Sequence, residues 1–147
     1  MDKVNQIIMN TLNNKIDNAS LINMYYEIGK QINTNNIKTK ELEYFLKQKY
    51  GITILFTERN LNNMVKFSKL SNINNYLELP WKLILILLKK DQDYTLFCKQ
   101  YYPTKKQMVE YINNGKIPKK NETFELDDTL EEIIKLKKGR DLKWQNI

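Results

Sequence analysis

The sequence contains no histidine, one cysteine and only two arginines among its 147 residues. The lack of histidine excludes His-based metal sites and His-assisted nucleophiles, and a single cysteine excludes an intramolecular disulfide or a Cys-rich zinc module. We expect Cys98 to be a buried structural thiol in a reducing compartment, and hence a cytoplasmic protein. Glycine, with four residues, and proline, with three, are also scarce. Few turn formers among many helix formers predict an all-α fold.

Long apolar runs are missing too. The longest, Leu83 to Leu88, is far too short to cross a bilayer, and the amphipathic N-terminus has no signal-peptide core, so no membrane partner is expected. The acids of 122–132 lack the spacing of a metal-dependent nuclease and suit the start of a helix. Without a phosphate-binding glycine loop or nucleophile motif, we expect no enzyme activity and no cofactor.

Positive charge is abundant, with a net charge of +7 carried almost entirely by lysine. Residues 1–121 hold 19 Lys/Arg against 10 Asp/Glu, whereas residues 122–147 hold five against seven. Lysine, asparagine and isoleucine share AT-rich codons, so genome composition is one source of this basicity. A basic main body nevertheless favours a polyanionic partner.

Apolar residues recur at helical spacing along the whole chain. The pattern predicts a compact multi-helix domain over 1–115, followed by a linker and C-terminal helix in 116–147. Thr39 and Thr57 are expected to cap helices, Thr104 with Gln107 forms a capping-box pattern, and Gly51 and Gly115 suit helix ends. Helices are expected over 3–17, 40–50, 57–70, 81–90, 104–115 and 129–138, the last capped by Asp127 or Asp128. The helical pattern through Ile32 is either a new helix or a continuation of the first. A further helix is expected from Asp91 or Asp93 to Tyr102. Ile52 to Phe56 is either a turn or a small strand.

Residues 39–70 predict a helix-turn-helix-like pair with a long connection. On its second helix, the positions outside the core carry groups that contact phosphates or base edges: Arg59, Asn62, Asn63, Lys66 and Lys69. An ordinary solvated helix face explains the same pattern. A second basic group is interleaved with tyrosines that either stack on bases or lie half-buried in the core. Its lysines are Lys99, Lys105, Lys106, Lys116, Lys119 and Lys120.

Several residues occur in an order and spacing that resemble a known family: Asn18, Tyr25-Tyr26-Glu27-Ile28-Gly29, Phe56-Thr57-Glu58-Arg59-Asn60-Leu61, Met64, Phe67, Leu79-Pro80-Trp81, Phe97, Thr104, Met108 and Ile112. Residues 18–113 resemble the N-terminal domain of the bacterial YhcG-type nucleases. The resemblance implies a helical domain with an expected DNA-binding role, common in mobile elements and phage-related loci.

That domain normally precedes a PD-(D/E)xK endonuclease domain, of which these residues contain none, so the resemblance implies no nuclease activity here. The sequence also has Tyr26 where the family usually has Trp, and Trp81-Lys82-Leu83 replaces a Trp-Ser-His element. Among the matching residues, Arg59 and Asn60 are polar residues in the first turn of the expected recognition helix. Each either contacts a partner or makes an interhelical hydrogen bond.

These features predict a non-catalytic module that binds nucleic acid, duplex DNA in preference to RNA. The alternative is a protein-binding adaptor or inhibitor that blocks a host or phage nuclease or nucleoprotein complex. Dimerisation through the apolar faces of 3–17 or 129–138 stays open.

Overall fold

A computed structural model describes the backbone of residues 1–145 and the side chains of residues 1–140. This part of the chain contains eight α-helices, two short 3₁₀ helices and no strand, which confirms the all-α prediction. In chain order they are α1 (Asp2–Leu12), α2 (Asn18–Thr34), α3 (Thr39–Tyr50), η1 (Ile54–Phe56), α4 (Glu58–Ser68), η2 (Ile73–Asn75), α5 (Trp81–Leu87), α6 (Thr95–Tyr101), α7 (Lys105–Asn114) and α8 (Asp128–Gln145).

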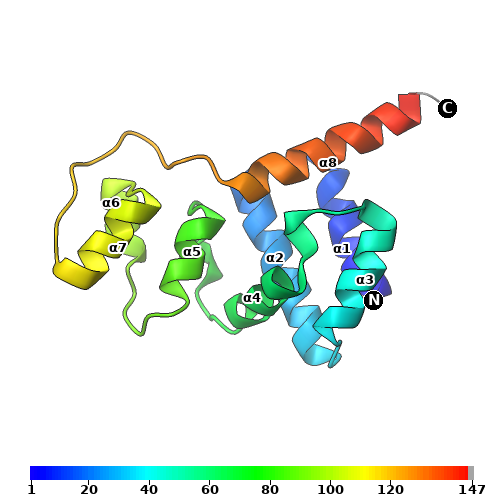
Figure 1. The fold of residues 1–147 in the computed structure, drawn as a ribbon, viewed down its shortest axis with the longest axis horizontal. Coiled ribbons are helices and arrows are strands. Elements are labelled where there is room, and N and C mark those ends of the chain that lie inside the picture. The colour runs from blue at the N-terminus through cyan, green and yellow to red at the C-terminus, as the bar shows by residue number, and fades with distance from the viewer. Residues whose placement is uncertain (146–147) are drawn as a thin grey trace.

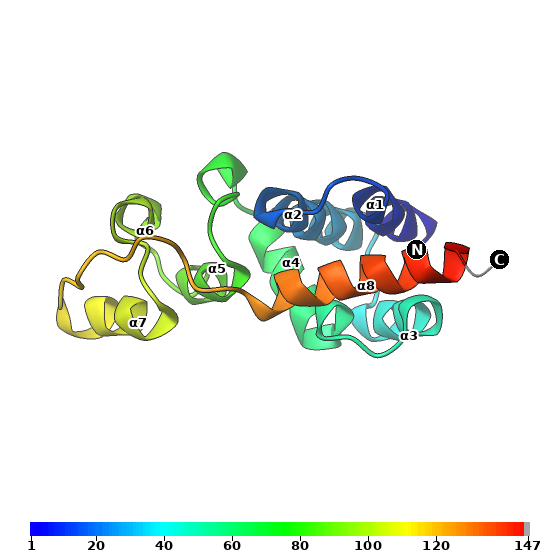
Figure 2. The ribbon, with the colours of Figure 1, turned by 90° about the horizontal axis from the view of Figure 1, so that it is seen from above.

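The helices form an elongated body with α5, α6 and α7 at one end and α1 to α4 at the other (Figure 1). After α7 the chain runs back along the molecule and enters α8. Seen from above, α8 lies along the N-terminal helices, with α1 and α2 on one side of it and α3 on the other (Figure 2). The last helix therefore packs on the first ones, mainly against η1 and α2.

The closest helix packing is between α2 and α4. Gly29 makes it possible, because a Cβ at that position would lie 2.0 Å from the Met64 carbonyl oxygen. Next to this contact, the buried Trp81 of α5 packs on Tyr25 and Phe67, with ring centroids 4.5 and 5.4 Å away. These aromatic contacts join α5 to the bundle.

Several of the predicted helix ends are confirmed. The Thr57 hydroxyl accepts a hydrogen bond from the Asn60 N–H, and Thr104 with Gln107 forms a complete capping box. Gly51 and Gly115 end α3 and α7 with φ angles of 80° and 69°, which glycine adopts without strain.

The predicted boundaries are wrong in several places. The first helix ends at Leu12 rather than at residue 17, because Asp17 forms a capping box with Ser20 and starts α2 as a separate helix. Thr39 is the first residue of α3, whose preceding residue makes no side-chain cap. The Ile52–Phe56 run holds η1 and no strand, and the helix expected over 81–90 ends at Leu87.

The C-terminal helix is longer than the predicted 129–138, and it contributes to the core. Ile133 of α8 is fully buried. Of the two candidate caps, Asp127 is the one whose carboxylate accepts from the N–H of Thr129, at 2.8 Å. Of all the helices described, none has the length and apolar character that a bilayer crossing requires.

Candidate nucleic-acid interface

The polar face of α4 is built by helical spacing. Arg59, Asn62, Asn63 and Lys66 follow one another at intervals of three, one and three residues, so they share a face, while Leu61, Met64 and Phe67 are fully buried on the other. The first turn is held by two caps: the Thr57 hydroxyl, and the Glu43 carboxylate, which accepts from the Glu58 N–H.

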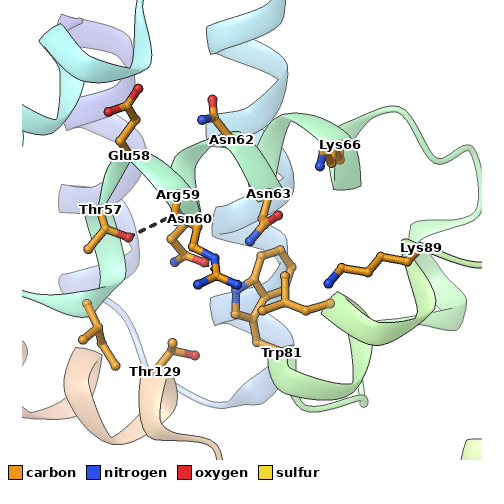
Figure 3. Close-up of a pocket in the computed structure, with 12 residues that line it drawn as sticks. Thr57, Glu58, Arg59, Asn60, Asn62, Asn63, Lys66, Trp81, Lys89 and Thr129 are labelled. Carbon is orange, nitrogen blue, oxygen red and sulfur yellow. Dashed lines mark hydrogen bonds between the residues drawn. The ribbon is translucent and has the colours of Figure 1, made fainter. Parts of the chain in front are cut away.

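This face borders a surface hollow of about 690 Å³. Its lining includes Arg59, Asn62, Asn63 and Lys66 of α4, together with Ile54, Leu85, Lys89, Trp81 and Thr129 from neighbouring elements. In Figure 3, Arg59 extends from α4 toward Trp81, and Lys89 extends from the turn after α5 into the same space. Together with Asn60, which also lines the hollow, five of the residues that the sequence singled out therefore lie around it.

The hollow is positively charged. Arg59, Lys66 and Lys89 line it, and Glu58 is the one acid in its lining. Glu58 points away from the space that the cations share (Figure 3). Within the described side chains only two ion pairs form, Lys82–Glu125 and Lys116–Glu110, and neither involves these cations. Their charge thus remains available to an anionic ligand.

Asn60 also lines the hollow, but its amide is engaged inside the protein, so its assignment as a candidate binding residue is corrected. Its side chain is 8% exposed, and the amide is used inside the protein: Nδ2 donates to the Leu55 carbonyl and Oδ1 accepts from Trp81 Nε1, each at 2.7 Å. Of the two roles open to it from sequence, the interhelical hydrogen bond is the one observed. Arg59 is exposed.

Lys89 was missed by the sequence reasoning. It follows the apolar run of α5 and carries no motif, so only the packing of α5 beside α4 brings it to the hollow. The one signal for it in the sequence was its spacing. Leu85 and Lys89 are four residues apart, so they share a face of the helix predicted over 81–90.

A buried tyrosine lies behind the hollow. Tyr25 is fully buried against Trp81, and its hydroxyl makes no hydrogen bond although the side chains of Thr129 and Asn60 are close. Burial raises the pKa of this phenol well above its usual range, an effect that those two neighbours only partly offset. The hydroxyl therefore stays protonated in the folded protein.

The remaining predicted residues lie elsewhere. Lys69 is exposed just beyond the end of α4 but does not line the hollow. Lys105 and Lys106 begin α7 and line a different hollow of about 710 Å³, together with Lys82, Glu110 and Glu125. Lys99 lies on α6, outside both. The structure does not unite the second lysine group with the first.

The tyrosines near this second group pack among themselves. Tyr111 stacks on Phe97 with centroids 3.9 Å apart and meets Tyr94 edge-on at 6.1 Å, and all three are half-buried. Tyr102 packs on Phe124. The half-buried alternative is therefore the observed one, and these rings form no open platform for bases.

Among the described residues, no group of three or more Cys, Asp or Glu side chains could hold a metal ion. Comparisons with known protein families, with curated proteins and with solved structures find no match to this chain.

Proposed function

We propose that this chain binds nucleic acid through the polar face of α4 and catalyses no reaction. The observation that carries the proposal is the shared lining of one hollow by Arg59, Lys66 and Lys89, with Asn62 and Asn63 between them. Guanidinium and ammonium groups pair with phosphates, and asparagine amides pair with base edges. This combination fits a nucleic acid better than a simple anion.

The proposal is tested by fluorescence anisotropy with labelled single-stranded and duplex DNA and with RNA, titrated against salt. Counterion release makes the affinity fall steeply as salt rises. Arg59→Ala should weaken binding roughly tenfold and reduce the salt dependence by about one phosphate contact. The variant should fold normally, because the Arg59 side chain is exposed and joins no hydrogen bond or ion pair in the described part of the chain.

Two results contradict the proposal. One is the absence of binding to all three nucleic acids at low salt. The other is an affinity of Arg59→Ala equal to that of the wild type, which would remove the hollow as the binding site.

We also propose that residues 18–113 share the fold of the YhcG-type N-terminal domain. In support, the matching residues serve the packing: Gly29 admits α4, Thr57 caps it and Trp81 fills the core. The Asn18 amide donates to the carbonyls of Leu77 and Leu79, both at 2.8 Å. A nuclease-domain gene beside the coding sequence, or a phage-related locus, would support this relationship.

A protein-binding role is the second candidate, favoured by two exposed apolar residues between α3 and α4. Ile52 is 87% exposed and Ile54, at the border of the hollow, is 48% exposed. An adaptor or inhibitor would use them against a host nucleoprotein complex. Such a complex would resist nuclease treatment in a pull-down and would be lost in Ile52→Ser, whereas nucleic-acid binding would be unchanged.

A further inference from the structure

The polar face of α4 is a wall of a concave surface. Ile54 of η1 and Thr129 of α8 border the hollow at one side, and Leu85 of α5 and Lys89 of the turn after it face α4 across the hollow. The close-up shows α4 and α5 on opposite sides of the space into which Arg59 and Lys89 extend (Figure 3). The face that carries the binding groups is thus recessed between other elements.

Because this face is recessed, the shape of a nucleic acid decides whether it can reach the polar side chains of α4. A helix that reads duplex DNA enters a major groove about 12 Å wide and about 8.5 Å deep, so its reading face has to project from the protein. Here α5 and η1 would meet the sugar–phosphate backbones before α4 reached the base edges. A single strand has no such restriction, because its unpaired bases turn out and enter a pocket.

The hollow has the mixed lining that an unpaired base and its phosphates require. Its volume of about 690 Å³ lies within the range of pockets that enclose small organic molecules. Leu85 and Ile54 contribute apolar surface, while Asn63 and Arg59 provide hydrogen-bonding groups beside it. Lys66 and Lys89 supply cations for the adjoining phosphates.

The concave surface continues past this hollow. A second one of about 460 Å³ shares Glu58 and Asn62 with the first and is lined by further polar and basic residues around the α2–α3 connection: Asn33 of α2, Asn36 and Lys38 of the connection, and Lys40 of α3. A flexible strand could follow this path from Lys89 past α4 to Lys38, with cations in both hollows and Glu58 between them. A straight duplex could not bend into both hollows.

We propose that the two hollows bind single-stranded nucleic acid, with an unpaired base in the hollow between α4 and α5. This inference rests on the proposed function and names its substrate class. The test compares, by fluorescence anisotropy, a labelled mixed-sequence strand of about 16 nucleotides with the duplex formed by its complement. The single strand should bind roughly tenfold more tightly than the duplex, since base contacts in the hollow are open only to unpaired bases.

The variants use a matched pair of lysines, one in the last turn of α4 and one just beyond its end. Lys66 and Lys69 are both exposed and three residues apart, but only Lys66 lines the hollow. Lys66→Ala and Lys89→Ala should each weaken single-strand binding several-fold, and Lys69→Ala should leave it unchanged. Binding of both DNA forms with equal affinity, or a preference for the duplex, overturns the single-strand inference and leaves nucleic-acid binding intact. A loss in Lys69→Ala equal to that in Lys66→Ala overturns the site, and no binding to either form overturns the proposed function as well.

Discussion

At the scale of single residues, neighbouring asparagines on α4 have opposite roles. The Asn60 amide links the Leu55 carbonyl to the Trp81 indole inside the protein, whereas Asn62 is exposed beside the hollow. The difference follows from helix geometry, since positions two residues apart point about 160° away from each other. One amide stabilises the fold, and the other is free to meet a ligand.

Asn60→Ala should therefore lower the free energy of unfolding by about 2–4 kcal/mol, because it leaves two buried polar groups, the Leu55 carbonyl and the Trp81 N–H, without partners. Urea denaturation followed by circular dichroism measures the change. Asn62→Ala is the matched control and should stay within about 0.5 kcal/mol of the wild type. Equal stabilities for the two variants would show that the Asn60 hydrogen bonds contribute little.

Cys98 provides a second test at this scale. It is fully buried with its Sγ 3.7 Å from Met108 Sδ, and burial raises the pKa of the thiol from 9.0 to about 12. The folded protein should react with a thiol reagent at pH 8 at least roughly 100-fold more slowly than the protein in urea, because both thiolate formation and access require opening. Rapid labelling without denaturant would contradict the burial.

The raised pKa of the Cys98 thiol predicts how the stability of the protein depends on pH. Between pH 9 and about 12 the folded protein keeps the Cys98 proton that the unfolded chain loses, so the free energy of unfolding falls as pH rises. The raised pKa of Tyr25 acts in the same direction above pH 10. Denaturation midpoints measured from pH 8 upward should decline, and Cys98→Ala should remove the part that begins near pH 9.

At the scale of helices, the contact between α2 and α4 depends on the absence of a side chain at Gly29. In Gly29→Ala the new Cβ would lie 2.0 and 2.5 Å from the Met64 carbonyl oxygen and carbon, which are backbone atoms and cannot rotate away. The two helices would have to separate, at a cost of about 1–3 kcal/mol or more.

Thermal denaturation measures this loss, and Gly139→Ala serves as its control. Gly139 lies inside α8 with open space at its Cβ position, so alanine there should stabilise the protein by about 0.5–1 kcal/mol. Opposite signs for the two substitutions are expected. A neutral Gly29→Ala would mean that α2 and α4 are less closely packed than described.

Local signals in the sequence predicted the helices and several of their ends. Thr57, the Thr104–Gln107 pair, Gly51 and Gly115 act through neighbours within a few residues, so their roles were visible in the sequence. The role of Asn60 was not, because its partner Trp81 lies 21 residues away. Lys89 joined the site for the same reason: its place depends on how α5 packs against α4, which no short pattern encodes.

At the scale of the whole molecule, the C-terminal helix packs on the N-terminal part of the chain. The segment after α7 returns along the body, and α8 buries Ile133 against the helices where the chain began (Figure 1). Removal of residues 122–147 would therefore uncover part of the core as well as any partner site in that region. Point substitutions give a cleaner test of function than truncation.

Asp127 links the start of α8 to the start of α5. Its carboxylate is 4% exposed and accepts from the Lys82 N–H at the start of α5 and from the Thr129 N–H at the start of α8, both at 2.8 Å. One side chain thus caps two helices that lie far apart in sequence. The sequence predicted Asp127, with Asp128 as the alternative, as the cap of the last helix. It did not predict the contact of Asp127 with α5.

Asp127→Ala should remove both caps and destabilise the protein by about 2 kcal/mol or more, since each cap contributes about 1 kcal/mol. Asp127→Asn keeps one acceptor oxygen and should lose less. Glu122→Ala, an exposed acid in the same segment, is the control and should be nearly neutral. Hydrogen exchange should show that the amides of α8 lose protection in Asp127→Ala before those of α2 and α4 do, because the cap fixes α8 to the body. If all helices lose protection together, α8 belongs to the same cooperative unit as the N-terminal bundle. Its docking then depends on Ile133 and its apolar neighbours rather than on the Asp127 carboxylate.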